Sequence, residues 1–320
     1  MLYNKKYFLF ILLIYLAVIS CKKESVTFLN IINLKNSPAY PHEKGLNVFF
    51  DLGSWMGFSL SDDKTITGFS GPYILGLEHG IWASNNFTSL DLISENGNSL
   101  LTNLNASEQN YFPGKLENQL HFEGIHLISN LIFTSDKNLI ISTTITNNGN
   151  QNLKFTPQWK GKIFRQIGRF INNDTHLITL MDNKQKIYLS PISNEVFKIH
   201  SDSNKYTISL NNIILKPKES KIYSIEIQYH PDKKNIKENT ATINILQAFE
   251  DNQLRWEKYL KITKANSLSK EEKLIITKSI CTLINNWKSA AGALKHDGLF
   301  PSYHYKWFQG FWSWDSWKHA

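Results

Sequence analysis

The chain has 320 residues, of which 42% are hydrophobic and 13% aromatic, so it is long enough for about two domains with sizeable cores. Its net charge is +8, but only three of its 35 basic residues are arginine, and the lysines are scattered along the chain. Proteins that bind nucleic acid gather basic side chains, often arginine, on one face. We therefore interpret the charge as a solvated surface and expect no nucleic-acid partner.

The N-terminus carries the features of an export signal. Two lysines precede the apolar stretch Tyr7–Ser20, which is too short to span a bilayer but suits the core of a signal peptide. Val18-Ile19-Ser20-Cys21 resembles a bacterial lipobox, in which the cysteine is lipidated. The sequence thus predicts a signal peptide at 1–20, a lipidated Cys21 followed by a tether over 21–45, and an exported protein anchored to a bacterial membrane, facing the periplasm or the cell surface. The alternative is a plain signal peptide with an incidental cysteine.

The remaining cysteine and the histidines give no sign of disulfide or metal chemistry. If Cys21 carries lipid, Cys281 has no partner, and its place in an apolar helical pattern predicts a small core residue. His79, His121 and His126 are interpreted as strand residues, since no Cys/His metal spacing is present. We therefore expect no cofactor, although calcium stays open because oxygen ligands can be dispersed in sequence.

Strands dominate the first two thirds of the mature chain. From about Leu46 to Tyr229, short alternating apolar runs are separated by Asn, Asp, Gly and Ser. This pattern predicts an antiparallel sandwich or barrel, and we assign a β-sandwich to residues 46–239. The expected strands are two around Asn130 within His121–Phe133, and one each in Leu139–Thr146, Lys186–Leu189, Tyr206–Leu210 and Lys221–Tyr229, with a turn at 147–150.

Helical periodicity begins after the polar connector His230–Asn239. Apolar residues at helical intervals predict one helix from about Thr242 to Thr263. Ser269 and Glu272 have the spacing of a capping box, and an apolar stripe follows that includes Trp287 and Ala291, with Gly292 as the expected terminator.

The segment that points to chemistry lies at the end of the chain. Four of the nine tryptophans fall within the last fourteen residues, around Asp315. Aromatic faces stack on the C–H faces of sugars, and a carboxylic acid enclosed by indole rings favours its neutral form and can protonate a glycosidic oxygen. The alternative is that the aromatic run is core and that Asp315 caps a helix.

The run Trp307–Lys318 resembles the signature of glycoside hydrolase family sixty-three, and Asp51–Leu60 more weakly resembles the start of the sandwich in its bacterial members. Members of that family are inverting enzymes that act on α-glucosides. They have an N-terminal β-sandwich, a helical linker and an (α/α)6 catalytic barrel. The resemblance therefore implies an oligosaccharide substrate, and that residues 240–320 form linker helices and the start of such a barrel.

The resemblance also implies roles for individual residues. Asp315 maps onto the general acid of the family. The residues implied in substrate binding are Phe311, Trp312, Trp314, Trp317 and Lys318, the last through a sugar hydroxyl. Trp55 is interpreted as core rather than as part of the site.

An inverting glycosidase also needs a carboxylate base that activates water. The chain ends five residues after Asp315, and the roughly 80 residues that follow Asn239 are too few for twelve helices of about 10–14 residues each. We therefore expect a truncated enzyme that lacks its base and is inactive alone.

Two other interpretations stay open. One is a glycosidase of another helical-barrel type, either trehalase-like or specific for α-mannosides. The other is a non-catalytic surface lipoprotein that binds glycans through the sandwich and the aromatic cluster. Substrate assays and the effect of Asp315→Asn on turnover and on glycan binding would separate them.

Overall fold

The structure is a computed structural model that describes residues 28–31, 35–45, 47–76, 80–173, 175–181, 185–231, 243–264, 267–303, 308 and 310–314. The predicted signal peptide, Cys21, His79, Asp315, Trp317 and Lys318 lie outside the described residues.

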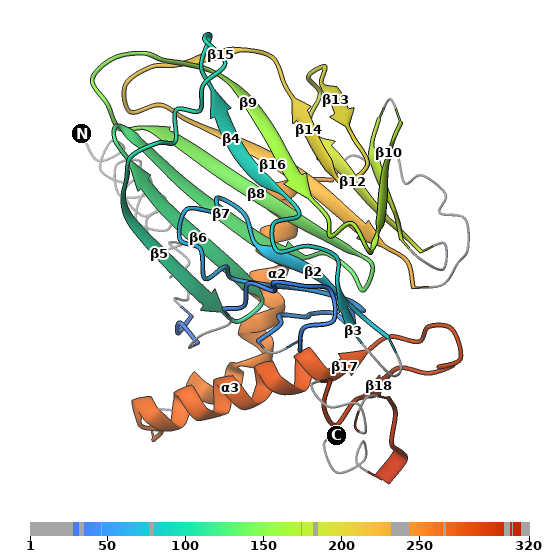
Figure 1. The fold of residues 1–320 in the computed structure, drawn as a ribbon. Coiled ribbons are helices and arrows are strands. Elements are labelled where there is room, and N and C mark those ends of the chain that lie inside the picture. The colour runs from blue at the N-terminus through green and yellow to red at the C-terminus, as the bar shows by residue number, and fades with distance from the viewer. Residues whose placement is uncertain are drawn as a thin grey trace, which may run out of the picture.

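Two antiparallel sheets pack face to face as a sandwich, with the hydrophobic core between them (Figure 1). In the described part of the chain, the larger sheet has eight strands in the order β10-β11-β12-β16-β8-β7-β6-β5. These strands are β5 (Leu104–Phe112), β6 (Lys115–Phe122), β7 (Ile125–Phe133), β8 (Asn138–Asn147), β10 (Gly168–Asn172), β11 (Leu177–Met181), β12 (Lys186–Ile192) and β16 (Ser220–Tyr229).

The opposing sheet has five described strands, in which β13-β14-β9-β15 form one path and β4 pairs with the other edge of β9. They are β4 (Ser89–Ile93), β9 (Leu153–Lys162), β13 (Lys198–Ser201), β14 (Lys205–Ser209) and β15 (Ile213–Leu215). A third sheet, β1-β2-β3, closes one end of the sandwich (Figure 1). Its strands are β1 (Met56–Ser59), β2 (Ser70–Leu75) and β3 (Gly80–Trp82).

The two-residue period of the strands explains why these segments build a sandwich. Along β9, Phe155 and Trp159 are buried, while Lys154 and Lys160 on the other face are exposed. Alternation of this kind sends every second side chain into the space between the sheets. The structure confirms the predicted β-sandwich, and it confirms the strands predicted in 139–146, 186–189, 206–210 and 221–229.

One predicted strand boundary is wrong. The break expected at Asn130 lies instead at Glu123-Gly124, between β6 and β7. Gly124 has a φ of +70°, which suits the tight turn, whereas Asn130 pairs with Ser142 inside the sheet. His121 and His126 are strand residues, as predicted, and their rings stack across the β6–β7 pair with centroids 4.0 Å apart.

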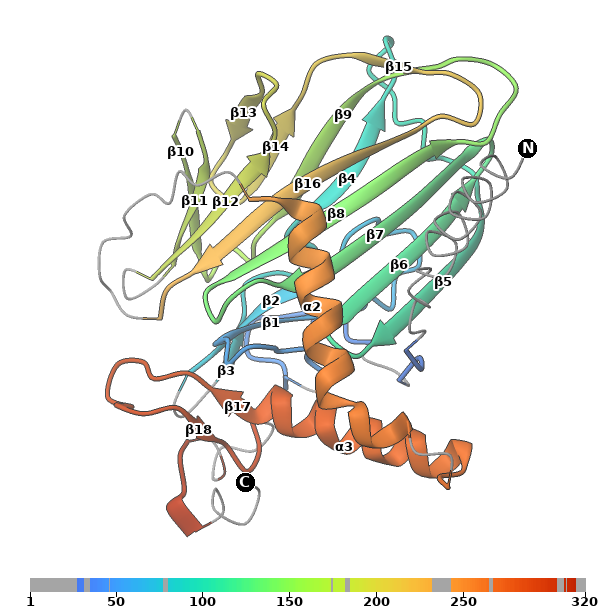
Figure 2. The same cartoon turned by 180° about the vertical axis from the view of Figure 1, so that it is seen from behind.

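Two α-helices follow the sandwich. Helix α2 (Ile245–Tyr259) starts at Asn244, whose side chain accepts a bond from the Gln247 N–H, and crosses the outer face of the eight-stranded sheet (Figure 2). A short 3-10 helix, η2 (Lys261–Lys264), leads to α3 (Lys270–Asn286). The predicted capping box is present at the start of α3: Ser269 accepts from the Glu272 N–H at 3.1 Å, and the Glu272 carboxylate accepts from the Ser269 N–H at 2.7 Å.

The predicted end of the second helix at Gly292 is wrong. Helix α3 ends at Asn286, and Trp287 is already extended. The chain then forms the short pair β17 (Trp287–Lys288) and β18 (Gly298–Leu299). Pairing of these two strands and the hydrogen bonds of Lys288 to the Ser54 and Asn285 carbonyls outweigh the helical periodicity that continued to Ala291.

The expected start of an (α/α)6 barrel is not evident in the described residues. Helix α2 packs on the sandwich through the buried side chain of Trp256, and α3 runs across the lower end of the sheets instead of alongside α2 (Figure 2). The buried residues of the two helices are Asn252 and Trp256 in α2 and Thr277, Cys281 and Asn285 in α3, whereas Leu246 and Ile275 are exposed. Within the described residues, no helix is long and apolar enough to cross a membrane.

We expect replacement of an isoleucine by alanine to destabilise the protein much more on one face of β16 than on the other. Ile225 is fully buried between the sheets, so Ile225→Ala should lower the free energy of unfolding by about 2–5 kcal/mol. Ile222, on the opposite face, is 51% exposed, and Ile222→Ala should change the free energy of unfolding by about 0.5 kcal/mol or less. Urea titrations of both variants check this, and equal losses would contradict the strand register.

Candidate functional site

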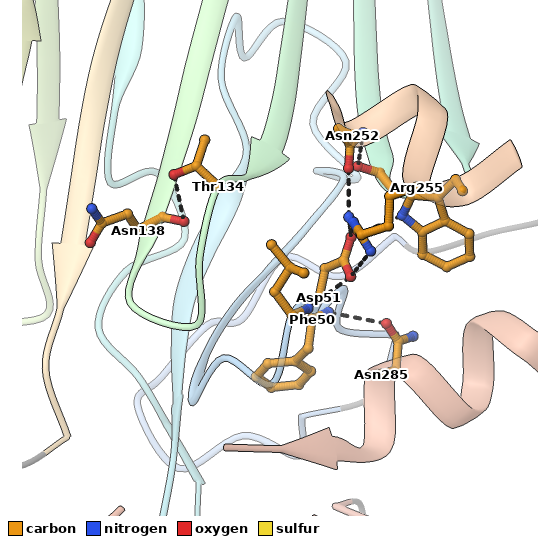
Figure 3. A network of polar contacts seen from close by, with 10 residues as sticks. Phe50, Asp51, Thr134, Asn138, Asn252, Arg255 and Asn285 are labelled. Carbon is orange, nitrogen blue, oxygen red and sulfur yellow. Dashed lines mark hydrogen bonds and ion pairs between the residues drawn. The ribbon is translucent and has the colours of Figure 1, made fainter. Parts of the chain in front are cut away.

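A buried ion pair joins the sandwich to α2. Asp51, which is fully buried just before β1, accepts hydrogen bonds at both carboxylate oxygens from Arg255 of α2, at 2.9 and 2.6 Å (Figure 3). Its Oδ2 also accepts from the indole N–H of Trp256 at 3.0 Å, and its Oδ1 from the Leu52 N–H at 2.7 Å. The carboxylate thus has the parallel, two-bonded geometry in which arginine pairs are strongest.

The helix side of this contact is equally well defined. Asn252 accepts from Arg255 Nη2 at 2.6 Å and donates to the Gly114 carbonyl at 3.1 Å (Figure 3). Gly114 has a φ of +76°, and a Cβ there would lie 2.1 Å from the Trp256 indole nitrogen. Only glycine leaves room for this close approach of the β5–β6 turn to α2.

The Arg255 guanidinium remains charged despite its burial. Burial alone would lower the pKa of the Arg255 guanidinium, but its hydrogen bonds and charge interaction with Asp51, with a further contribution from Tyr259, outweigh this and raise the pKa. Arg255 also lies 5.5 Å from the centroids of the Trp256 and Tyr259 rings, where a cation is favoured.

A second contact ties the end of α3 to the same segment. The fully buried Lys288 side-chain nitrogen donates to the Ser54 and Asn285 carbonyls at 3.0 and 2.8 Å and lies over the Phe50 ring. The Asn285 side chain accepts from the Phe50 N–H at 3.2 Å (Figure 3). Burial lowers the pKa of Lys288 well below its usual range, and the nearby Asp51 charge offsets this only in part.

The contacts of Lys288 and Asn285 precede the aromatic segment, by which we mean residues 300–318, and further contacts hold the start of this segment on the sandwich. The Trp55 indole donates to the Ser289 carbonyl at 3.0 Å and packs edge-on against Phe300. The Tyr303 hydroxyl donates to the Val48 carbonyl at 2.9 Å, and its ring packs against Phe50. Trp55 is therefore core, as the sequence suggested, but it is core shared between the sandwich and the aromatic segment.

The described aromatic side chains after Tyr303 are exposed. Phe311 is 45% exposed, Trp312 48% and Trp314 66%. Phe311 also lies against Gly298 of β18, where a Cβ would come within 2.2 Å of its ring. Exposed indole and phenyl faces in consecutive positions can stack on the apolar faces of sugar rings.

The structure therefore locates only part of the predicted site. Phe311 lies against Gly298 of β18, and Trp312 and Trp314 follow it in the chain as exposed side chains. Asp315, Trp317 and Lys318 lie outside the described residues, so their roles remain predictions. Among the described residues, no group of three or more His, Cys, Asp or Glu side chains could hold a metal ion.

Sequence reasoning missed the contacts that support this segment. Asp51 was noted only within a stretch of family resemblance, and Arg255 and Lys288 were treated as surface charges. A signal did exist for Arg255, because it is one of only three arginines and lies beside Trp256 on a helix. Nothing local to Asp51 or Lys288 indicated burial.

Residues 33–280 match the family described as "Glucosidase YgjK, N-terminal". A protein from the human microbiome assigned as a kojibiose phosphorylase has a similar structure, with a TM-score of 0.53 and 10% sequence identity over 75% of this chain. The match covers 39% of that protein's length, and at this identity it establishes a common fold alone.

Weaker likenesses link the sandwich to smaller proteins. A galactose mutarotase related enzyme from Lactobacillus acidophilus aligns with a TM-score of 0.41 at 9% identity, over 59% of this chain and 99% of its own length. A galactose mutarotase-like protein from Lactobacillus casei aligns with a TM-score of 0.39 at 9% identity, over 57% of this chain and 99% of its own length. TM-scores this low carry no functional inference.

Breaking the buried pair should destabilise the protein strongly. Asp51→Asn leaves the Arg255 charge without its carboxylate, so we expect the free energy of unfolding to fall by about 3–5 kcal/mol. The exposed pair Lys154–Glu95 supplies the control, since Glu95→Gln should cost less than about 1 kcal/mol. Chemical denaturation measures both, and similar costs would show that the Asp51 contact is not a structural requirement.

The buried lysine should make stability depend on alkaline pH. An ordinary lysine in the unfolded chain titrates near pH 10.4, well above the lowered pKa of Lys288 in the folded state. Between these two values the unfolded state binds more protons, so stability rises with pH, by at most about 1.4 kcal/mol per pH unit.

Lys288→Met removes the contribution of Lys288 to the pH dependence of stability. The stability of the wild type relative to the variant should therefore increase from pH 7 to pH 10 in urea titrations. Lys295→Met, at an exposed lysine nearby, controls for other titrating groups. A difference that stays flat or falls with pH would contradict the assignment.

Proposed function

Because the chain belongs to the family of the N-terminal domain of glucosidase YgjK, we propose that it is the sandwich and substrate-facing aromatic segment of an inverting α-glucosidase of the family sixty-three type. The observation that carries the proposal is the row of exposed aromatic side chains at Phe311, Trp312 and Trp314, directly before Asp315. Large exposed aromatic side chains next in sequence to a carboxyl group match the needs of a site that cleaves a glycosidic bond.

In this proposal Asp315 donates a proton to the glycosidic oxygen as the bond to the departing group breaks. Trp312, Trp314 and Trp317 form the wall of the sugar pocket, and Lys318 hydrogen-bonds a sugar hydroxyl. A second carboxylate, which in enzymes of the family sixty-three type belongs to the (α/α)6 catalytic barrel, removes a proton from the water that attacks the opposite face of the sugar. The reaction needs no cofactor, since the two carboxyl groups complete the proton transfers.

The proposed location follows from the N-terminal sequence. Cleavage before Cys21 and lipidation of its thiol would leave the sandwich tethered to a bacterial membrane after export. The substrate would then be an α-linked oligosaccharide of the periplasm or of the cell surface. Residues 21–45 would form the tether between the lipid and the folded domain.

The general-acid assignment can be tested in the protein encoded by the complete open reading frame that contains this chain. We expect hydrolysis of an α-glucosyl disaccharide, and we expect Asp315→Asn to lower kcat by about 10²–10⁴-fold. Asp297→Asn provides a matched control, because Asp297 lies on the same segment but bonds only to the Ala290 N–H among described partners. Proton NMR of the first product should show the β-anomer, as inversion requires.

Each alternative has its own signature in this assay. Turnover that requires inorganic phosphate would identify a phosphorylase, the activity named for the human microbiome protein of similar fold. Glycan binding without turnover, unchanged in Asp315→Asn, would identify a binding module instead. Preferred cleavage of trehalose or α-mannosides would reassign the substrate while leaving the acid in place.

A further inference from the structure

The outer face of the five-stranded sheet is a polar surface that the proposed function does not use. Figure 1 shows this sheet in front, with no described helix over it. Lys160, Thr207 and His200 lie side by side across β9, β14 and β13. Two residues further along β9, on the same face of the sheet, Lys162 lies directly opposite Lys205 of β14.

A cavity of about 590 Å³ lies over this part of the sheet. Its lining includes the three lysines at positions 160, 162 and 205, together with Asn172, His200 and Thr207. The volume falls within the range typical of small-molecule sites. A neighbouring polar cavity of about 360 Å³ shares Asn86, Lys160 and Lys162 with it, so the hollow continues along the sheet.

The three lysines of this cavity differ in whether an ion pair balances their charge. Lys160 forms an ion pair with Asp91. Among the described residues, Lys162 and Lys205 have no ion-pair partner, although they face one another across the β9–β14 pair. Like charges directly opposite on neighbouring strands repel, and the repulsion falls when an anion lies between them.

Two carboxylates lie in or beside the cavity, Asp202 in its lining and Asp91 in that of the neighbouring cavity. Asp91 is buried and also accepts from the Ser99 hydroxyl and from the Leu92 N–H. Asp202 accepts from the Asn204 and Lys205 backbone N–H groups at 2.8 Å each, as part of a turn. Asp202 itself lines the cavity, and its charge interacts with that of Lys205, but among the described residues neither carboxylate forms an ion pair with Lys162 or Lys205.

We propose that this cavity binds an acidic saccharide, a sugar unit that carries a carboxylate or sulfate group, with the acid group between Lys162 and Lys205. The Thr207 hydroxyl and the Asn172 amide line the same cavity and supply neutral partners for sugar hydroxyls. Charge-assisted bonds from the two lysines select the acid group, and the cavity has room for a sugar unit beside it.

This site is separate from the aromatic segment. Strands β13 and β14 lie at one end of the sandwich, and β17 and β18 lie at the other (Figures 1 and 2). An acidic glycan bound there would hold the protein on its polysaccharide and leave the aromatic segment free. The inference does not depend on the proposed catalytic activity.

Isothermal titration of the intact chain with digalacturonate and with a sulfated chondroitin disaccharide tests the proposal. We expect saturable binding of at least one of them, weakened by added salt, and about tenfold or more weaker in Lys162→Gln/Lys205→Gln. Whichever probe binds identifies the acid group. The variant Lys154→Gln/Lys198→Gln changes the net charge equally on the same sheet face, outside the cavity, and should bind as the wild type does.

Three results would overturn the proposal. Equal weakening in both double variants would show attraction to net charge rather than a site. Binding of acetate or inorganic sulfate as tight as that of the saccharides would show that no sugar is recognised. Binding of neutral maltotriose with the same affinity would show that the lysines do not select an acid group.

Discussion

The Asp51–Arg255 ion pair is the interaction on which the described arrangement depends. It connects a turn of the N-terminal segment to a helix more than two hundred residues later, and the sandwich strands lie between these positions in sequence. A carboxylate without solvent contact is costly unless its oxygens are bonded, and here Arg255, Trp256 and Leu52 supply those bonds. Helix α2 consequently has one orientation on the eight-stranded sheet in which the pair is satisfied.

That orientation positions the rest of the chain. Once α2 is held, η2 and α3 bring Asn285 and Lys288 to the carbonyl and amide groups of the Phe50–Ser54 turn. Trp55 then meets Ser289 and Phe300. The aromatic segment therefore leaves the sandwich from a rigid base of buried rings, although its own outer side chains are exposed.

The sandwich serves two surfaces with different chemistry. One end supports aromatic side chains suited to the apolar faces of sugars. The outer face of the five-stranded sheet carries lysines, a histidine and hydroxyl groups in cross-strand rows. Both arise from the same alternation: the inward side chains form the core, so the outward ones are free to carry charge or hydroxyl groups.

Much of the architecture could be predicted from sequence, because periodicity is a local property. Alternating runs in 139–146 and 221–229 and the capping box at Ser269 each depend on residues close together in the chain. The predicted boundaries were wrong where contacts between residues distant in sequence decide the local structure. Gly124, not Asn130, is the turn, and Trp287 leaves the helix because β18 offers strand pairing.

The sequence by itself determined the sandwich, the helices after it and the aromatic segment around Asp315, since composition and spacing carry that information. Only the tertiary structure decided that Asp51 and Lys288 are buried, that Arg255 is a structural partner, and that Lys162 and Lys205 share a cavity. The reason is physical: burial and pairing depend on which segments meet in space. A charged residue looks the same in sequence whether solvent or a partner more than two hundred residues away satisfies it.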